Sequence, residues 1–207
     1  MRSLVALLLL SSIALASPPA SVPERAAQLR DDGRRLTLSM DFPELADAAV
    51  QRRLDSGLAT TVVTRAYLFK DGGSRVESLA VQTVRVAYDL WDEVWVVEQI
   101  GESGRTVTHE KQRRDVVRRI AAVDALPLVE HARLVPGTRY VVAVMVELNP
   151  VSPALLSQVR RWLSRPREGA ASDGESYFGS FVSLFVNRKV GEAEKVLRFR
   201  TPVWVAP

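Results

Sequence analysis

Alternating apolar and polar positions recur along the chain and predict a series of β-strands. In residues 34–42, Leu36, Leu38 and Met40 fall on one face, while Thr37 and Ser39 fall on the other. Similar alternation, or a run of β-branched and aromatic residues, predicts further strands at 58–70, 76–90, 94–100, 105–108, 138–148 and 196–205. Short turn sequences separate most of these strands, which is typical of an antiparallel meander.

Helical periodicity appears in the connections between these strands. Segment 43–56 opens with Pro43 and is followed by Gly57, which suit the first helical position and the C-cap of a helix. Amphipathic spacing predicts further helices at 110–123 and 152–165, and 177–186 fits a helix or a strand. Residues 126–134 favour no single element. The fold class predicted is α+β: a mainly antiparallel β-sheet or β-sandwich-like domain with three or four helices in the connections.

The N-terminal sequence has the three parts of a secretory signal peptide. Arg2 is followed by an apolar run, and Ala14-Leu15-Ala16 forms a small-x-small cleavage site, so we expect residues 1–16 to be removed before Ser17. The alternative is an uncleaved membrane anchor, but the apolar run is shorter than the roughly 20 residues that a membrane-spanning helix needs. No cysteine follows the cleavage site, which excludes a lipoprotein anchor.

The signal predicts the location and the division of the chain. We expect an exported protein, periplasmic if the cell is Gram-negative, with no transmembrane segment after signal cleavage. Residues 17–33 are rich in Pro, Ala and Arg and are interpreted as a flexible leader, and 34–206 as a single β-rich domain. The chain has no cysteine, so an apolar core rather than disulfides must hold this domain together.

Charge and motifs argue against several function classes. The net charge of +4 is small for 207 residues, and together with export it argues against a nucleic-acid partner. The only histidines are His109 and His131, without the spacing of a metal site, and no serine-hydrolase or phosphate-binding motif occurs. We therefore expect no cofactor, no metal and no catalytic residues. An enzyme that cleaves envelope polymer with paired carboxylates stays open as a weaker alternative.

Four sequence segments resemble a family of short exported bacterial proteins described only as a domain of unknown function. The segments are an early helix running into a strand, a strand around a Trp-Asp pair, a central strand and a terminal aromatic strand: FPELADAAVQRRLDSGLATTVVTRAYLFK, VAYDLWDEVWVVEQIG, LVPGTRYVVAVMVELNPV and FRTPVWV. The resemblance covers Arg34 to Val205. It implies an envelope location and assigns no activity or site residues.

Two small groups of residues are the candidates for a binding site. Trp91, Asp92 and Glu93 lie at a predicted turn, where an exposed tryptophan beside acids would suit a recognition loop; the alternative is a tryptophan packed under the sheet. Arg118 and Arg119 lie on the polar face of a predicted helix, where they could face an anion or simply complement the helix dipole.

These observations favour a non-enzymatic envelope protein that binds another protein, such as an inner-membrane partner. Pairing at a sheet edge is the simplest mode, and 196–205 is the edge we expect to be used. Deleting that strand is expected to abolish binding and leave the rest folded. The alternative is a carrier of a small apolar ligand or lipid, enclosed by the sheet and a helical lid at 177–186. The partner and the oligomeric state stay open.

Overall fold

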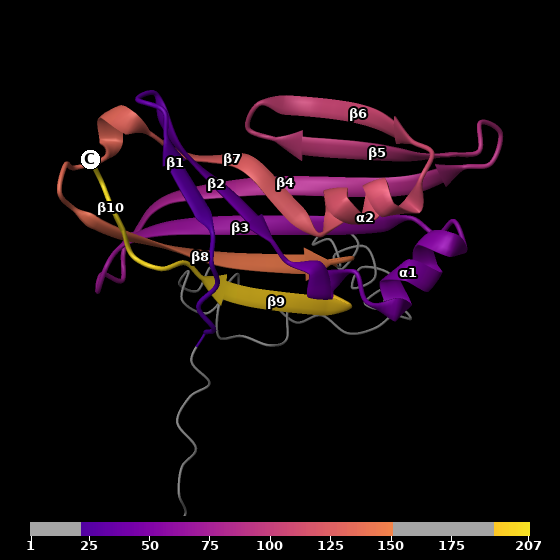
Figure 1. The fold of residues 1–207 in the computed structure, drawn as a ribbon, viewed down its shortest axis with the longest axis horizontal. Coiled ribbons are helices and arrows are strands. Elements are labelled where there is room, and N and C mark those ends of the chain that lie inside the picture. Colours follow the sequence, from indigo (N-terminus) through magenta and orange to yellow (C-terminus); the bar gives the residue numbers. More distant parts are fainter. Residues whose placement is uncertain (1–21, 151–192) are drawn as a thin grey trace, which may run out of the picture.

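The computed structural model describes residues 22–150 and 193–207, and they form two antiparallel β-sheets with a few short helices (Figure 1). The large sheet has seven strands in the order β10-β8-β3-β4-β5-β6, and β9 lies beside β10 along β8. Its strands are β3 (Thr60–Lys70), β4 (Val76–Asp89), β5 (Val94–Gly101), β6 (Gly104–Glu110), β8 (Arg139–Leu148), β9 (Lys195–Arg200) and β10 (Trp204–Val205). The small sheet has the order β1-β2-β7 and contains β1 (Gln28–Asp31), β2 (Arg35–Asp41) and β7 (Ala122–Glu130).

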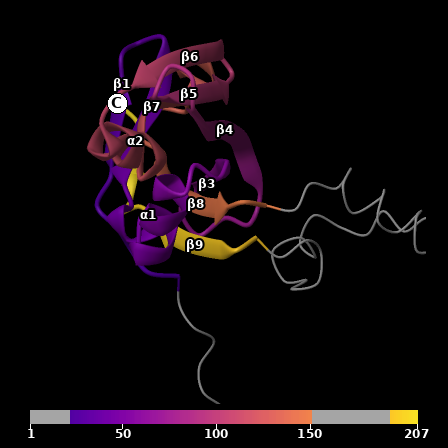
Figure 2. The same ribbon diagram turned by 90° about the vertical axis from the view of Figure 1, so that its right-hand side faces the viewer.

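The small sheet and the helices cover one face of the large sheet (Figure 2). Because side chains alternate along a strand, β2 directs Leu36, Leu38 and Met40 into the space between the sheets. They meet Val62, Ala66 and Leu68 of β3 and the even-numbered residues of β8 in a single core. The mainly antiparallel β fold predicted from the sequence is therefore confirmed.

The helices are fewer and shorter than predicted. The described residues contain two α-helices, α1 (Ala48–Asp55) and α2 (Arg113–Ile120), and two 3-10 turns, η1 (Pro43–Leu45) and η2 (His131–Arg133). The prediction of three or four helices is thus not supported. Segments 152–165 and 177–186 lie outside the described residues.

The two predicted helices that fall within the described residues are shorter in the structure, because residues at their ends belong to neighbouring turns or strands. In 43–56, Asp47 accepts hydrogen bonds from the backbone amides of Ala49 and Val50, and this N-cap starts α1 after the separate turn η1. In 110–123, Glu110 belongs to β6 and Ala122 starts β7, so α2 keeps only the central residues. Its buried face consists of Val116 and Ile120, four residues apart.

Several predicted strands match the structure closely, and two described strands were not predicted. Gln28–Asp31, interpreted as part of the leader, form β1 and pair with β2. Ala122–Glu130 form β7, which pairs with β2 through two register shifts. The predicted strand 196–205 is divided by Pro202 into β9 and β10, and it lies at an edge of the large sheet as that proline indicated.

Two ion pairs tie the start and end of the described chain to the η1–α1 region. Arg25 donates from Nη1 to Glu44 Oε2 at 2.9 Å, and Lys195 Nζ lies 2.9 Å from Asp47 Oδ2. Each partner lowers the pKa of its carboxyl, chiefly by hydrogen bonding to the ionised form. The pKa of Asp32 is lowered as well, by hydrogen bonds from the backbone amides of Arg35 and Arg34.

These lowered pKa values predict a loss of stability in acid. A carboxyl with a lower pKa in the folded state than in the unfolded state stabilises the fold above its unfolded pKa, and it loses that contribution as pH falls through the folded pKa. With ordinary pKa values of 3.8 for Asp and 4.5 for Glu, the free energy of unfolding in urea should decrease below about pH 4.5. Glu44→Gln should weaken this dependence, and a free energy that rises toward pH 3 would contradict the prediction.

Candidate functional site

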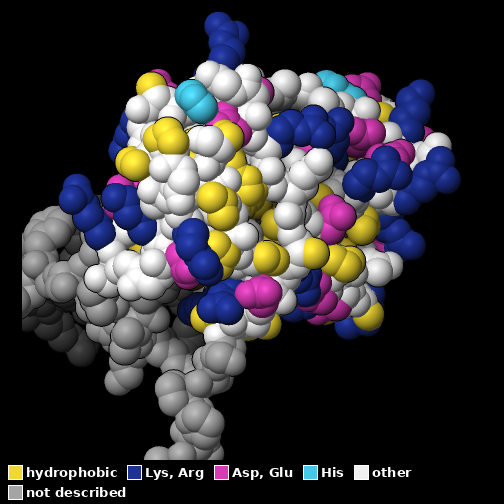
Figure 3. All heavy atoms as spheres, turned by 60° about the vertical axis from the view of Figure 1, so that its left-hand side comes forward, with side chains coloured by type: hydrophobic (Ala, Val, Ile, Leu, Met, Phe, Trp, Pro, Cys, Tyr) yellow, Lys and Arg dark blue, Asp and Glu magenta, His cyan; other side chains and the backbone are white. Residues whose placement is uncertain are grey.

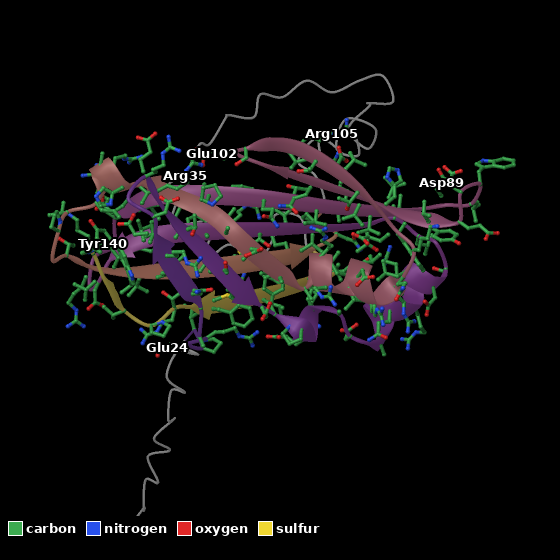
Figure 4. The ribbon with its side chains drawn as sticks, turned by 45° about the horizontal axis from the view of Figure 1, so that its top comes forward. Glu24, Arg35, Asp89, Glu102, Arg105 and Tyr140 are labelled. Carbon is green, nitrogen blue, oxygen red and sulfur yellow. The ribbon has the colours of Figure 1, made fainter. Side chains whose placement is uncertain are left out.

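The most exposed apolar residues of the described chain lie on the loop between β4 and β5, which we call the tip loop (Leu90–Glu93). The side chain of Trp91 is 95% exposed and that of Leu90 is 79% exposed. Asp92 and Glu93 are exposed as well, so the structure brings all three predicted recognition residues together at one surface. Figure 1 shows the loop projecting beyond the sheets, and Figure 4 labels Asp89 at its base.

The tip loop has a defined backbone. Asp89 Oδ1 accepts hydrogen bonds from the backbone amides of Trp91, at 2.9 Å, and Asp92, at 3.3 Å. Glu93 then adopts a left-handed conformation with φ of 54°, which returns the chain to β5. Below the loop, Tyr88 and Trp95 pack edge to face at 5.0 Å between ring centroids. The two tryptophans beside the turn thus have different environments: Trp95 is packed on the sheet, and Trp91 points into solvent.

The tip loop and the residue that starts it carry acids and no bases. Asp89, Asp92 and Glu93 give this end of the hairpin three carboxylates, and no lysine or arginine occurs between residues 86 and 104. Apolar side chains beside negative charge suit a partner with an apolar pocket and a basic rim. An anionic lipid surface would be repelled by the same charges.

A second candidate is a polar groove of about 1050 Å³ between α2, β2 and the strands β4 and β5. Its lining includes Gln82, which is 5% exposed and accepts a hydrogen bond from Gln99 Nε2 at 3.2 Å. The signal for Gln82 was in the sequence, because it shares the alternation of the buried Val84 and Val86. Sequence reasoning missed it, and it also missed Leu90 beside Trp91.

The predicted anion-facing residues Arg118 and Arg119 line this groove, but each has an acidic neighbour. Arg118 Nη1 lies 3.3 Å from Asp115 Oδ1, and Arg119 Nε lies 3.6 Å from Glu110 Oε1. Asp41 and Asp124 add two further carboxylates to the lining. The groove therefore has more acids than bases, so an anion role for the two arginines gains no support from their surroundings and stays a prediction.

Other exposed apolar residues are dispersed among charged ones. On the end of the molecule seen in Figure 3, apolar side chains are interspersed with basic and acidic ones. Among the residues that the structure describes, no cluster of three or more His, Asp or Glu could hold a metal ion. Over the same residues, no helix has both the length and the apolar character to cross a membrane.

A model of a protein family described as a domain of unknown function, DUF4390, matches residues 21–173. The chain belongs to the DUF4390 family. The resemblance found in the sequence, to an uncharacterised domain family, is thereby confirmed. The DUF4390 match spans β1 to β8 with the tip loop and the groove, and it ends before β9 and β10. No curated protein and no solved structure shows significant similarity to the chain.

Proposed function

We propose that the protein is a non-enzymatic binding module of the cell envelope, which engages another protein through its tip loop. The observation that carries this proposal is the exposure of Trp91 and Leu90 on a loop whose backbone is held in place. Keeping such side chains in water forgoes roughly 1.5–3 kcal/mol for each that a partner could bury. A tryptophan on a preorganised loop is also the kind of residue that dominates protein interfaces.

Export to the envelope is a part of this proposal and is supported by residues 1–16, which have the composition of a secretory signal. In that compartment we expect the partner to be an envelope protein or the external region of an inner-membrane protein. The acids beside Trp91 favour a partner with basic residues around an apolar pocket.

The experiment is crosslinking in the native host, with the full chain carrying a photoreactive amino acid in place of the exposed Asp92, which leaves Leu90 and Trp91 unchanged. We expect crosslinks to one envelope protein, mapped to a single surface of that protein. With purified partner, the double variant Leu90→Ala/Trp91→Ala should bind roughly 30-fold or more weakly, which corresponds to about 2 kcal/mol.

The matched control is Leu79→Ala/Val81→Ala. Leu79 and Val81 lie on strand β4 and are 45% and 40% exposed, so this pair removes exposed apolar side chains away from the tip loop, although less apolar surface than the tip variant removes. The control variant should bind like the wild type. If Leu90→Ala/Trp91→Ala bound as tightly as the wild type, or if crosslinks formed only with cytoplasmic proteins, the proposal would be overturned. A small molecule that copurifies with the protein, in the absence of protein crosslinks, would favour the alternative function as a carrier of an apolar ligand or lipid.

A further inference from the structure

Strand β6 forms one edge of the large sheet. It pairs with β5 from Trp95↔Glu110 to Gly101↔Gly104 without a register shift. No other described strand pairs with it, so one row of its backbone N–H and C=O groups faces away from the sheet. Figure 4 labels Glu102 and Arg105 at the end of the β5–β6 hairpin.

The two-residue turn fixes which residues face outward. Gly101 and Gly104 close the turn and exchange hydrogen bonds, so the residues that bond to β5 are Gly104 and every second residue after it. Arg105, Val107 and His109 therefore direct their backbone N–H and C=O groups away from β5. Among the described residues no hydrogen bond reaches these groups.

The other sheet edges in the described part of the chain are shorter, interrupted or closed at one end. β7, the edge of the small sheet opposite β1, has nine residues but contains Pro127 and pairs with β2 through two register shifts. Arg200 of β9 donates its backbone N–H to Pro23 at 3.0 Å and accepts from the N–H of Arg25 at 2.8 Å, which closes that end of the edge. β10 has two residues and follows Pro202, and β1 has four. β6 has seven residues, no proline, no bulge and no covering segment of the described chain. Among the described edge strands, β6 is therefore the longest one with a regular and open edge.

The side chains on β6 indicate what kind of strand would fit. Val107 lies directly opposite Glu98 of β5, and on the same face both Arg105 and Arg85 approach that one carboxylate. Two guanidinium groups sharing one acid leave an excess positive charge beside the edge. Arg105 and His109 stand two residues on either side of Val107, so acids at the matching positions of a new strand would complement them.

We propose that β6 binds an extended segment of a partner protein as an added strand, with an apolar residue opposite Val107 and acidic residues two positions to each side. This inference deepens the proposed function and rests on it, because it gives the shape and charge of the bound segment. A second copy of this chain is a poorer occupant, because antiparallel pairing centred on Val107 would set Arg105 opposite His109 and bring no acid to either.

The test uses a synthetic peptide, Ser-Thr-Asp-Thr-Val-Thr-Asp-Thr-Ser, with the full chain. At roughly 1 mM peptide, hydrogen exchange at the amides of Arg105, Val107 and His109 should slow at least about tenfold. Thr106 and Thr108, already bonded to β5, should change little. This alternation is a signature that contact through side chains alone would not give.

Variants at position 107 isolate the backbone contact. Val107→Pro removes the outward N–H at a position where an edge strand tolerates proline, and it should abolish peptide binding. Val107→Thr keeps the amide and the β-branched shape and should bind like the wild type. If Val107→Pro unfolds, N-methylation of the peptide gives the same test: a methyl on the central valine amide should abolish binding, and one on the adjacent threonine should not.

Each outcome is decisive for one of the two proposals. Unprotected amides, or binding that survives both Val107→Pro and methylation of the valine amide, would overturn the β6 inference. If crosslinks at position 92 persist in that case, the proposed function stands without the β6 inference. A homodimer in sedimentation that Val107→Pro dissociates would also overturn the inference, because the occupant would then be a second copy of the chain.

Discussion

Deleting Lys195–Pro207 should abolish cooperative folding. These residues supply β9 and β10, which together pair with β8 from Arg139 to Leu148. Phe199 is 5% exposed and belongs to the core, and the loss of one buried phenylalanine side chain alone costs about 3–5 kcal/mol. A domain of this size has a total stability of roughly 5–15 kcal/mol, so moderate further losses of interactions are enough to unfold it.

Those further losses are hydrogen bonds of the backbone of β8. Thr201, which is 1% exposed, accepts a hydrogen bond from the Val142 N–H on its Oγ1 and donates its own N–H to the Val142 carbonyl. Deletion leaves both groups of Val142 without these partners in the interior of the protein, at about 1–3 kcal/mol for each such group. Circular dichroism of the truncated chain should show no cooperative thermal transition.

The control for this truncation is removal of Pro207 alone, which is exposed and should unfold like the full chain. Thr201→Val keeps the shape of the side chain and removes the hydroxyl, so its thermal stability should lie between that of the truncated chain and that of the chain without Pro207. A truncated chain that unfolds cooperatively, with wild-type stability, would contradict the prediction. The burial of Phe199 and Thr201 argues against the expectation that 196–205 can be deleted while the rest stays folded, because this segment supplies core residues as well as a sheet edge.

The strands could be predicted from the sequence because their alternation is imposed by burial of one face. Residues 34–42 alternate throughout, whereas 138–148 is a nearly continuous apolar run whose alternate residues are buried in the structure; β2 and β8 match these segments within one or two residues. β1 gave no such signal: its four residues include a single apolar side chain, Leu29, which pairs with Leu38 of β2. The strand β7 was not predicted because it contains Pro127 and because Ala125, with a φ of 47°, interrupts the alternation of its side chains.

The candidate site was predictable only in part. A turn at Asp92-Glu93 followed from the hairpin pattern, but the sequence did not distinguish a packed tryptophan from an exposed one. The structure distinguishes them by position: Trp95 lies within β5 and meets Tyr88, while Trp91 lies beyond the last strand pair, Asp89↔Val94. The open edge at β6 and the pairing of Arg118 and Arg119 with acids are contacts between distant segments, which no local pattern records.

The same substitution, leucine to alanine, at a buried and at an exposed position should separate effects on stability from effects on binding. Leu38 of β2 is fully buried between the sheets, so Leu38→Ala should lower the free energy of unfolding by about 2–5 kcal/mol. Leu90 is 79% exposed, and Leu90→Ala should change the free energy of unfolding by less than about 0.5 kcal/mol. Urea unfolding of both variants measures the difference.

The same two variants test whether Leu38 contributes to stability alone and Leu90 to binding alone. Leu38→Ala, studied where it is still folded, should bind the crosslinked partner as the wild type does, because Leu38 lies in the core and the tip loop is unchanged. Leu90→Ala should be as stable as the wild type and bind more weakly, because its side chain makes no contribution to the core. If Leu90→Ala destabilised the protein as much as Leu38→Ala, then Leu90 would be a structural residue, and its exposure would no longer support a binding role.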